Sequence, residues 1–338
     1  MPLLDSDLPL AAAPMAGGPT TAALAAAVTA AGCFAFVPAG YLSAEAFAAE
    51  LTAAHATGSP FGVNLFVPQP GTIDPAAFRA YREAIRPDAD ALGVDLPVEP
   101  RHDDDAWREK VALLVADPAP VVSLTFGLPE RADIDALRAA GSRVLATVTT
   151  PEEARAAEDA GVDGLVVQGP RAGGHSGTFD PRRAITDAAT ADVVRAVTGV
   201  TRLPLVAAGG VSGPADVRDL LAAGAEAVAV GTLLLRAPEA GTTTTHRAAL
   251  ADPAFTDTML THAFTGRPAR ALRNSFARRH HADAPYGYPE LHHLTRELRR
   301  AAARTGDPHR LHLWAGTGWR SAPERPAGEI LRELSAGL

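Results

Sequence analysis

The chain has 338 residues, of which 47% are hydrophobic and 21% are charged, and its formal net charge at pH 7 is −8. This length fits one large α/β barrel with an extension, or two ordinary domains, and the apolar content excludes wholesale disorder. The negative charge argues against nucleic acid and against an anionic membrane surface as partners.

Cysteine usage and the first residues bear on localisation. Cys33 is the only cysteine, so no intramolecular disulfide can form and a cytoplasmic location is expected. Residues 1–18 contain no Lys or Arg and lack the positive start of a secretory signal. An apolar run over residues 22–39 is interpreted as a helix followed by a buried strand, because it is mostly alanine and is interrupted by glycine.

Short apolar runs alternate with longer alanine-rich segments, a pattern typical of a parallel sheet with crossover helices. The eight predicted strands are residues 10–13, 33–39, 61–66, 121–126, 144–148, 164–168, 205–208 and 227–233. Predicted helices between them include residues 20–31, 44–57, 151–160, 187–197 and 214–223. Eight units without an opening G-x-G-x-x-G favour a closed (β/α)8 TIM barrel over an open doubly wound sheet.

Some segments interrupt this rhythm. Residues 68–105 are predicted as an insertion after the third strand, with a helix over 74–85. The alternation stops near residue 242, so we expect a barrel over residues 1–241 and an extension over 242–338. We expect the extension to fold over the barrel and the active site as helices and loops. Lys110, the only lysine, is expected on a surface helix, which disfavours Schiff-base chemistry.

Paired small residues mark the ends of the last two strands. Gly209-Gly210 follows the seventh strand, and Gly231-Thr232 lies within the eighth. Glycines there let backbone N–H groups approach an anion, and these loops are the habitual phosphate site of the fold. A tight turn is the alternative for one pair alone. Two pairs on adjacent strands favour a phosphate-bearing ligand.

The loop after the sixth strand reads QGPRAGGHSG and contains His175, our candidate catalytic residue. An unperturbed histidine pKa near 6.5 suits proton abstraction at neutral pH. The alternative is a structural histidine, which the surrounding glycines and the location disfavour. Asn64, after the third strand, is either a turn residue or a partner for the edge of a flavin ring. The uncharged loop at 13–18 suits contact with a flat aromatic cofactor.

Eight short motifs then occur in a fixed order. They are APMAG (13–17), GVNLF (62–66), TFGLP (125–129), QG with AGGH (168–169 and 172–175), AAGG (207–210), VGT (230–232), GRPAR (266–270) and LWAG (313–316). Together they resemble the nitronate monooxygenases, once called 2-nitropropane dioxygenases, from about residue 8 to residue 334. The resemblance implies an FMN-bound barrel without a metal. The FMN-binding residues expected are Pro14, Met15, Ala16, Asn64, Gln168, Gly173, Gly174, Gly209, Gly210, Gly231 and Thr232.

The same resemblance implies an activity. An alkyl nitronate would react with O2 over the flavin to give a carbonyl compound and nitrite, in a monomer or homodimer. His175 would serve as base or substrate-orienting residue, and with a neutral nitroalkane it would first remove the proton beside the nitro group. Arg171 stands where the family usually has an acidic residue, and Thr317 where it usually has glutamine. These differences bear on substrate choice.

Two other functions are considered. A flavin-dependent enoyl-thioester reductase using NAD(P)H resembles the same barrel and also carries a Gly-Gly-His loop. A catalytically idle flavin- or phosphate-binding protein is the other.

Two polar clusters lie in the C-terminal region. The basic one is predicted as a solvated face, with docking of an anionic substrate or carrier as the alternative. Its members are Arg267, Arg270, Arg273, Arg278 and Arg279. The histidine cluster matches no zinc spacing and is predicted as a polar surface segment. Its members are His280, His281, His292 and His293.

Overall fold

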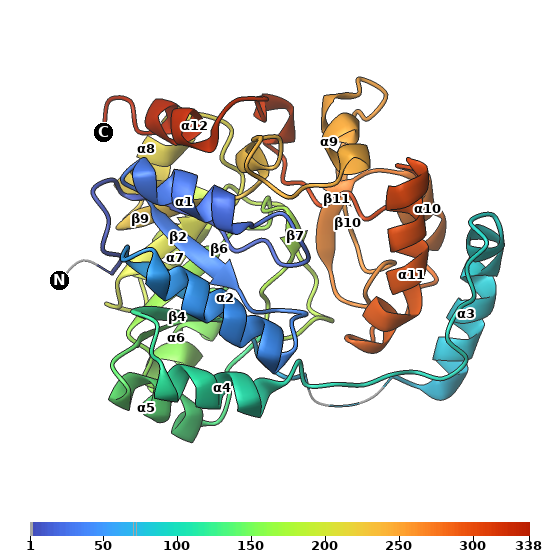
Figure 1. Cartoon of the computed structure of the whole chain (residues 1–338), viewed down its shortest axis with the longest axis horizontal. Helices are drawn as coiled ribbons and strands as arrows, with labels where there is room; N and C mark the ends of the chain where they lie inside the picture. Colours follow the sequence, from blue (N-terminus) through green and yellow to red (C-terminus); the bar gives the residue numbers. More distant parts are fainter. Residues whose placement is uncertain (1–2, 70, 72) are drawn as a thin grey trace.

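The computed structural model describes residues 3–69, 71 and 73–338. Within them, eight parallel strands close into a barrel in the order β1-β2-β3-β4-β5-β6-β8-β9, and β9 pairs back with β1 (Figure 1). The strands are β1 (Leu10–Ala12), β2 (Phe34–Pro38), β3 (Phe61–Phe66), β4 (Val121–Thr125), β5 (Arg143–Val148), β6 (Gly164–Gln168), β8 (Leu205–Ala208) and β9 (Ala227–Val230). The predicted (β/α)8 barrel is confirmed.

Helices cover the outside of the barrel, so the strands are buried on both faces and read as continuous apolar runs. These helices are α1 (Ala22–Ala30), α2 (Ala44–Ala56), α4 (Trp107–Ala116), α5 (Arg131–Ala139), α6 (Pro151–Asp159), α7 (Thr190–Thr198) and α8 (Pro214–Ala222). Hydroxyl side chains cap the starts of α1, α2 and α6; at α6 the Thr150 hydroxyl accepts from the Glu153 N–H at 3.2 Å. The predicted eighth strand ends earlier than expected, because Gly231 leads into the 3-10 turn η1 (Thr232–Leu234).

The insertion forms helix α3 (Pro75–Asp90), which runs past the predicted end at residue 85 and through Pro87. Proline normally disfavours a helix interior. Here Tyr81, Ile85 and Ala89 recur at four-residue spacing and are buried in one cluster with leucines of α11 (Glu290–Thr305). The insertion therefore packs against the C-terminal extension (Figure 1).

The extension contains an antiparallel sheet that the sequence did not predict. Strands β10 (Thr258–Thr261) and β11 (Ala269–Leu272) pair with each other, and β11 pairs with β7 (Gly174–His175) from the loop after β6. The expectation of helices and loops alone is wrong, because strands this short carry little periodic signal. The other elements are α9 (Thr244–Ala251), α10 (Ser275–His280), α11, η2 (Trp319–Ser321) and α12 (Ala327–Leu334).

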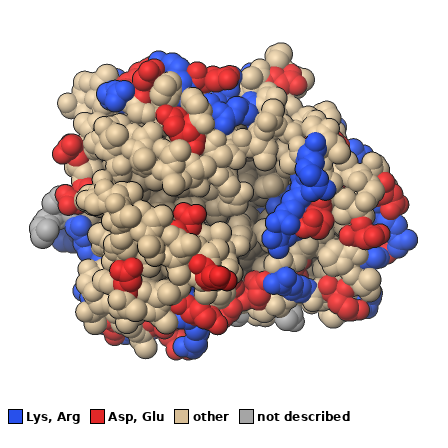
Figure 2. Space-filling model, viewed as in Figure 1, with Lys and Arg blue, Asp and Glu red and all other residues tan. Residues whose placement is uncertain are grey.

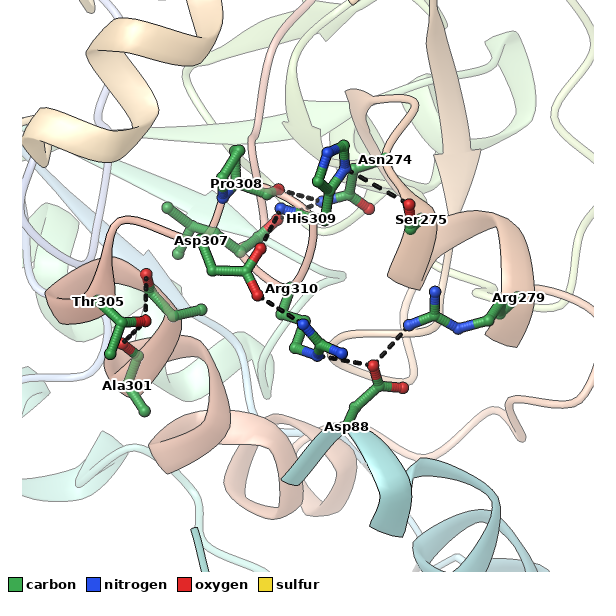
Figure 3. A network of polar contacts seen from close by, with 12 residues as sticks. Asp88, Asn274, Ser275, Arg279, Ala301, Thr305, Asp307, Pro308, His309 and Arg310 are labelled. Atoms are coloured by element: carbon green, nitrogen blue, oxygen red, sulfur yellow. Dashed lines mark hydrogen bonds and ion pairs between the residues drawn. The ribbon is translucent and has the colours of Figure 1, made fainter. Parts of the chain in front are cut away.

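A buried carboxylate of the insertion forms hydrogen bonds and ion pairs with the extension (Figure 3). Asp88 of α3 is 4% exposed and accepts from Arg279 at 2.5 Å, His280 at 2.8 Å and Arg310 at 2.8 Å. Burial would raise the pKa of Asp88, but the hydrogen bond from His280 and the charges of the arginines outweigh it and lower this pKa below its usual value. The prediction of a polar surface segment is wrong for His280 and His292, which are buried.

The prediction that Lys110 lies at the surface is also wrong. It lies on α4 but is 1% exposed, and its Nζ meets Asp105 Oδ2 at 2.8 Å. The carboxylate compensates the buried ammonium, which explains why a lysine is tolerated there. In the described part of the chain, every helix is too short or too polar to cross a membrane.

Candidate active site

A cavity of about 1010 Å³ opens at the carboxyl ends of the barrel strands. All twelve residues singled out from the sequence line it: Pro14, Met15, Ala16, Asn64, Gln168, Gly173, Gly174, His175, Gly209, Gly210, Gly231 and Thr232. Side chains of the extension, including Tyr288, His292 and Trp314, form part of the same wall. The cavity thus lies between the barrel and the extension.

The loops after β8 and β9 present free backbone donors to this cavity. The N–H groups of Gly209, Gly210 and Gly231 donate to no other group in the described part of the chain. Gly209 has φ +106° and Gly210 φ +80°, and a Cβ on Gly209 would lie 2.7 Å from Ala172 Cβ. Adjacent unpaired N–H groups in such a concavity suit an anion, a phosphate above all.

A loop of the extension packs against the loops that follow β6 and β9. The Gly316 N–H donates to Thr232 Oγ1 at 3.0 Å, and a Cβ on Gly173 would lie 2.5 Å from the Gly316 nitrogen. Thr317 N–H donates to the Arg171 carbonyl at 3.1 Å, while the Arg171 guanidinium pairs with Asp187 at 2.8 Å. The two departures from the family pattern therefore meet, and neither side chain lines the cavity.

The two amide side chains of the cavity are used differently. Asn64, 4% exposed, donates from Nδ2 to Ser123 Oγ and to Thr125 Oγ1, both at 2.9 Å. Its Oδ1 accepts from none of the described residues and remains an acceptor for a ligand. Gln168 donates to the His175 carbonyl at 3.0 Å and accepts from the Gly177 N–H at 2.7 Å. Gln168 therefore holds the loop that carries His175.

His175 lies on β7, and the pairing of β7 with β11 fixes its backbone. Its Nε2 lies 2.9 Å from Thr265 Oγ1, and its ring packs at 5.3 to 5.9 Å from the rings of Phe126, Tyr288 and Trp314. Burial, together with the charges of two arginines, lowers the pKa of His175 to about 3. This value lies below the unperturbed histidine pKa near 6.5, because the ring packs among aromatic side chains and lies near two cationic guanidiniums. His175 is neutral at neutral pH.

The two arginines are Arg267 and Arg299, and both are buried. Arg267 lies over the Phe126 ring at 4.1 Å and donates to Gln69 Oε1 at 2.7 Å and to the Thr178 carbonyl. Burial lowers the pKa of each guanidinium to about 10, so both stay charged at neutral pH. The prediction of a solvated basic face is wrong for Arg267 and Arg270, which are 0% and 9% exposed.

Aromatic rings cover the space around His175. Tyr41 stacks on His292 with ring centroids 4.2 Å apart, and Tyr288 packs edge-on against the rings of Phe126 and His175. Burial raises the pKa of Tyr41 to about 12, so this hydroxyl is neutral. Further out, Figure 2 shows the cavity mouth as a hollow with basic side chains along one margin and acidic ones along another.

Several cavity residues were not found from the sequence. Tyr41 follows β2, a strand end that could have been searched by the same rule as the others. Phe126 and Trp314 lie inside the quoted motifs, but no role was assigned to them. Arg299 sits on a charged helix of the extension, where local sequence carries no sign of burial.

The fold and the cavity define a (β/α)8-barrel protein whose cavity, at the carboxyl ends of its strands, is lined by unpaired backbone N–H groups. The chain matches the family model described as nitronate monooxygenase over residues 5–337. It is 38% identical to a nitronate monooxygenase of Pseudomonas aeruginosa, covering 98% of this chain and 96% of the relative. It is 32% identical to a probable nitronate monooxygenase of Staphylococcus aureus (strain Newman), covering 98% and 94%. The chain belongs to the nitronate monooxygenase family.

Solved structures agree with this assignment. A nitroalkane oxidase from Streptomyces ansochromogenes superposes with a TM-score of 0.92 at 43% identity, covering 98% of this chain and 96% of the other. FabK from Thermotoga maritima superposes with a TM-score of 0.75 at 24% identity, covering 98% and 93%. The second similarity concerns the fold alone.

Proposed function

We propose that this chain binds FMN in the cavity and oxidises alkyl nitronates with O2 to a carbonyl compound and nitrite. The observation that carries the proposal is one cavity that joins unpaired backbone donors to a neutral histidine beside buried cations. The names of the Pseudomonas and Streptomyces relatives, which refer to nitronates and nitroalkanes, support it.

The residues present fit FMN. The free N–H groups of Gly209, Gly210 and Gly231 would receive its phosphate, and Thr232, whose oxygen already accepts from Gly316, would donate its hydroxyl proton. The flat ring would lie along Pro14, Met15 and Ala16, with Asn64 Oδ1 accepting from a ring N–H and Gln168, Gly173 and Gly174 nearby. At about 1010 Å³, the cavity is at the upper end of the roughly 300–1,000 Å³ of small-molecule sites, which leaves room for a substrate.

When bound, FMN supplies the redox chemistry by accepting electrons from the substrate and passing them to O2. The chain's own residues orient the nitronate, exclude water and hold charge. Thr265 engages His175 Nε2, which leaves Nδ1 without a partner among the described residues and available to substrate. A nitronate has already lost the proton beside its nitro group, so His175 needs only to orient it. A neutral nitroalkane would require His175 to become cationic beside Arg267 and Arg299, which its low pKa opposes.

The test is anaerobic mixing of the flavin-loaded protein with an alkyl nitronate before any nicotinamide is added, while the flavin absorption spectrum is followed. Loss of the oxidised flavin spectrum is expected. A spectrum that stays oxidised, with NAD(P)H oxidation that depends on an enoyl thioester, would favour the reductase instead. Burial of Arg267 and Arg270 removes them from any carrier-docking face for that activity. Purified protein that retains no flavin would contradict the assignment of FMN as the cofactor.

A further inference from the structure

Arg299 is a buried cation that faces the cavity without a carboxylate partner. It is 6% exposed and lines the cavity from α11. No carboxylate of the described residues lies within ion-pair distance of its guanidinium, whereas Arg310, also in the extension, pairs with Asp88 and Asp307. Buried arginines are ordinarily paired, because an uncompensated charge in a water-poor interior is costly.

The hydrogen bonds of Arg299 leave part of the guanidinium free. Nε donates to Thr295 Oγ1 at 3.0 Å, and Nη2 donates to the His292 carbonyl at 2.9 Å and lies 3.3 Å from His292 Nδ1. Nη1 donates to no other group in the described residues. A guanidinium has five N–H donors, so unused donors remain at the cavity wall. Arg267 differs, since it lies behind Phe126 and its Nε, Nη1 and Nη2 each have a neutral acceptor.

The groups around Arg299 are neutral or cationic. His292 and Thr295 contact it from its own helix, Tyr41 packs on His292, and Arg296 and Arg300 lie on the same helix. The acidic side chains that line the cavity are at residues 103–105 and 109, and Asp105 among them is paired with Lys110. The missing counter-charge is therefore open to a ligand.

We propose that Arg299 is the residue that selects an anionic nitronate over the neutral nitroalkane, by supplying the substrate's counter-charge. This inference rests on the proposed function. An anion gains a charge-assisted hydrogen bond that the neutral molecule does not. The same charge hinders proton transfer to His175, which a nitroalkane requires and a nitronate does not. Both effects favour the nitronate.

The test compares the wild-type flavoprotein with Arg299→Met, Arg299→Lys and Arg304→Gln. Met keeps the apolar stem, Lys keeps the charge, and Arg304 is an exposed arginine of the same helix outside the cavity. Binding of nitrate, an unreactive planar anion, is measured by calorimetry at fixed ionic strength. Arg299→Met should weaken nitrate binding at least about tenfold, as expected for one hydrogen bond to a charged group. Arg299→Lys should retain most of the affinity, and Arg304→Gln should bind like wild type.

Turnover gives the second measurement. The ratio of kcat/KM for a nitronate to that for its nitroalkane should fall in Arg299→Met and recover in Arg299→Lys. Nitrate binding that is insensitive to Arg299→Met would overturn the inference, as would an unchanged ratio. A shifted flavin midpoint potential with unchanged nitrate affinity would instead assign the charge to the flavin. Arg299→Gln replaces the Met variant if that protein does not fold. If Arg299→Met loses nitrate binding while the wild-type protein turns over no nitronate, the proposed function fails but the assignment of Arg299 to anion binding stands.

Discussion

Replacing Asp88 by asparagine should destabilise the attachment of the insertion to the extension. The carboxylate is 4% exposed and is the shared acceptor of Arg279, His280 and Arg310. Removing one partner of a buried ion pair costs about 3–5 kcal/mol, and partial exposure of the two arginines reduces this to about 2–4 kcal/mol. At about 2.1 cal/mol/K of unfolding entropy per residue, a chain of this length should lose about 3–6 °C in Tm.

Thermal unfolding of the Asp88→Asn protein, followed by circular dichroism at pH 7, measures this loss. Asp192→Asn is the matched control, because Asp192 pairs with Arg195 on α7 with both side chains more than half exposed, and it should change Tm by less than about 1–2 °C. The pKa of Asp88 is lowered in the folded state, so its contribution is complete above its unfolded pKa, about 4. It is lost as pH falls through the lower folded value. A Tm loss no larger than that of Asp192→Asn would refute the reasoning.

Three predictions concern the cavity. His175→Ala should lower nitroalkane turnover more than nitronate turnover, since only the nitroalkane needs a proton acceptor, and unchanged nitroalkane activity in steady-state assays would rule out that role. Gly209→Ala should weaken FMN retention at least about tenfold in a fluorescence titration, as roughly 1.4 kcal/mol of strain suffices. Its Cβ would lie 2.7 Å from Ala172 Cβ at φ +106°, whereas Gly213→Ala, with open space and extended backbone, should bind FMN normally. The kcat/KM for nitronate should show no inflection near pH 6.5, because the pKa of His175 is about 3 and the ring is neutral above that pH. An inflection there that His175→Asn removes would contradict this.

The barrel could be predicted because its strands are buried on both faces. Each appears as a short apolar run, and the predicted β3, β6 and β8 have the observed bounds. The sheet of the extension could not be predicted in this way. Strand β11 is four residues long and contains a buried arginine, and its partner β7 comes from a loop more than ninety positions earlier. Such pairing depends on tertiary contacts that leave no local period.

The cavity residues likewise fall into a group that could be predicted from the sequence and a group that could not. Residues at strand ends, such as Asn64 and Gly209, follow from the fold, because parallel strands bring their carboxyl ends together. The lowered pKa of His175 could not be predicted from the strand ends, because Arg267 and Arg299, which help lower it, come from the extension. In the sequence they are two among many arginines. Only folding distinguishes them from the exposed Arg273 and Arg278.

The pairing of β7 with β11 also has a consequence for the order of synthesis. His175 leaves the ribosome well before the strand that fixes its backbone, at Ala269–Leu272, and before Trp314, which packs against its ring. A nascent chain in which all eight barrel strands are complete therefore still lacks the side of the cavity that the extension supplies. The cavity that we propose as the active site is therefore complete only after nearly all of the residues of the chain have been made.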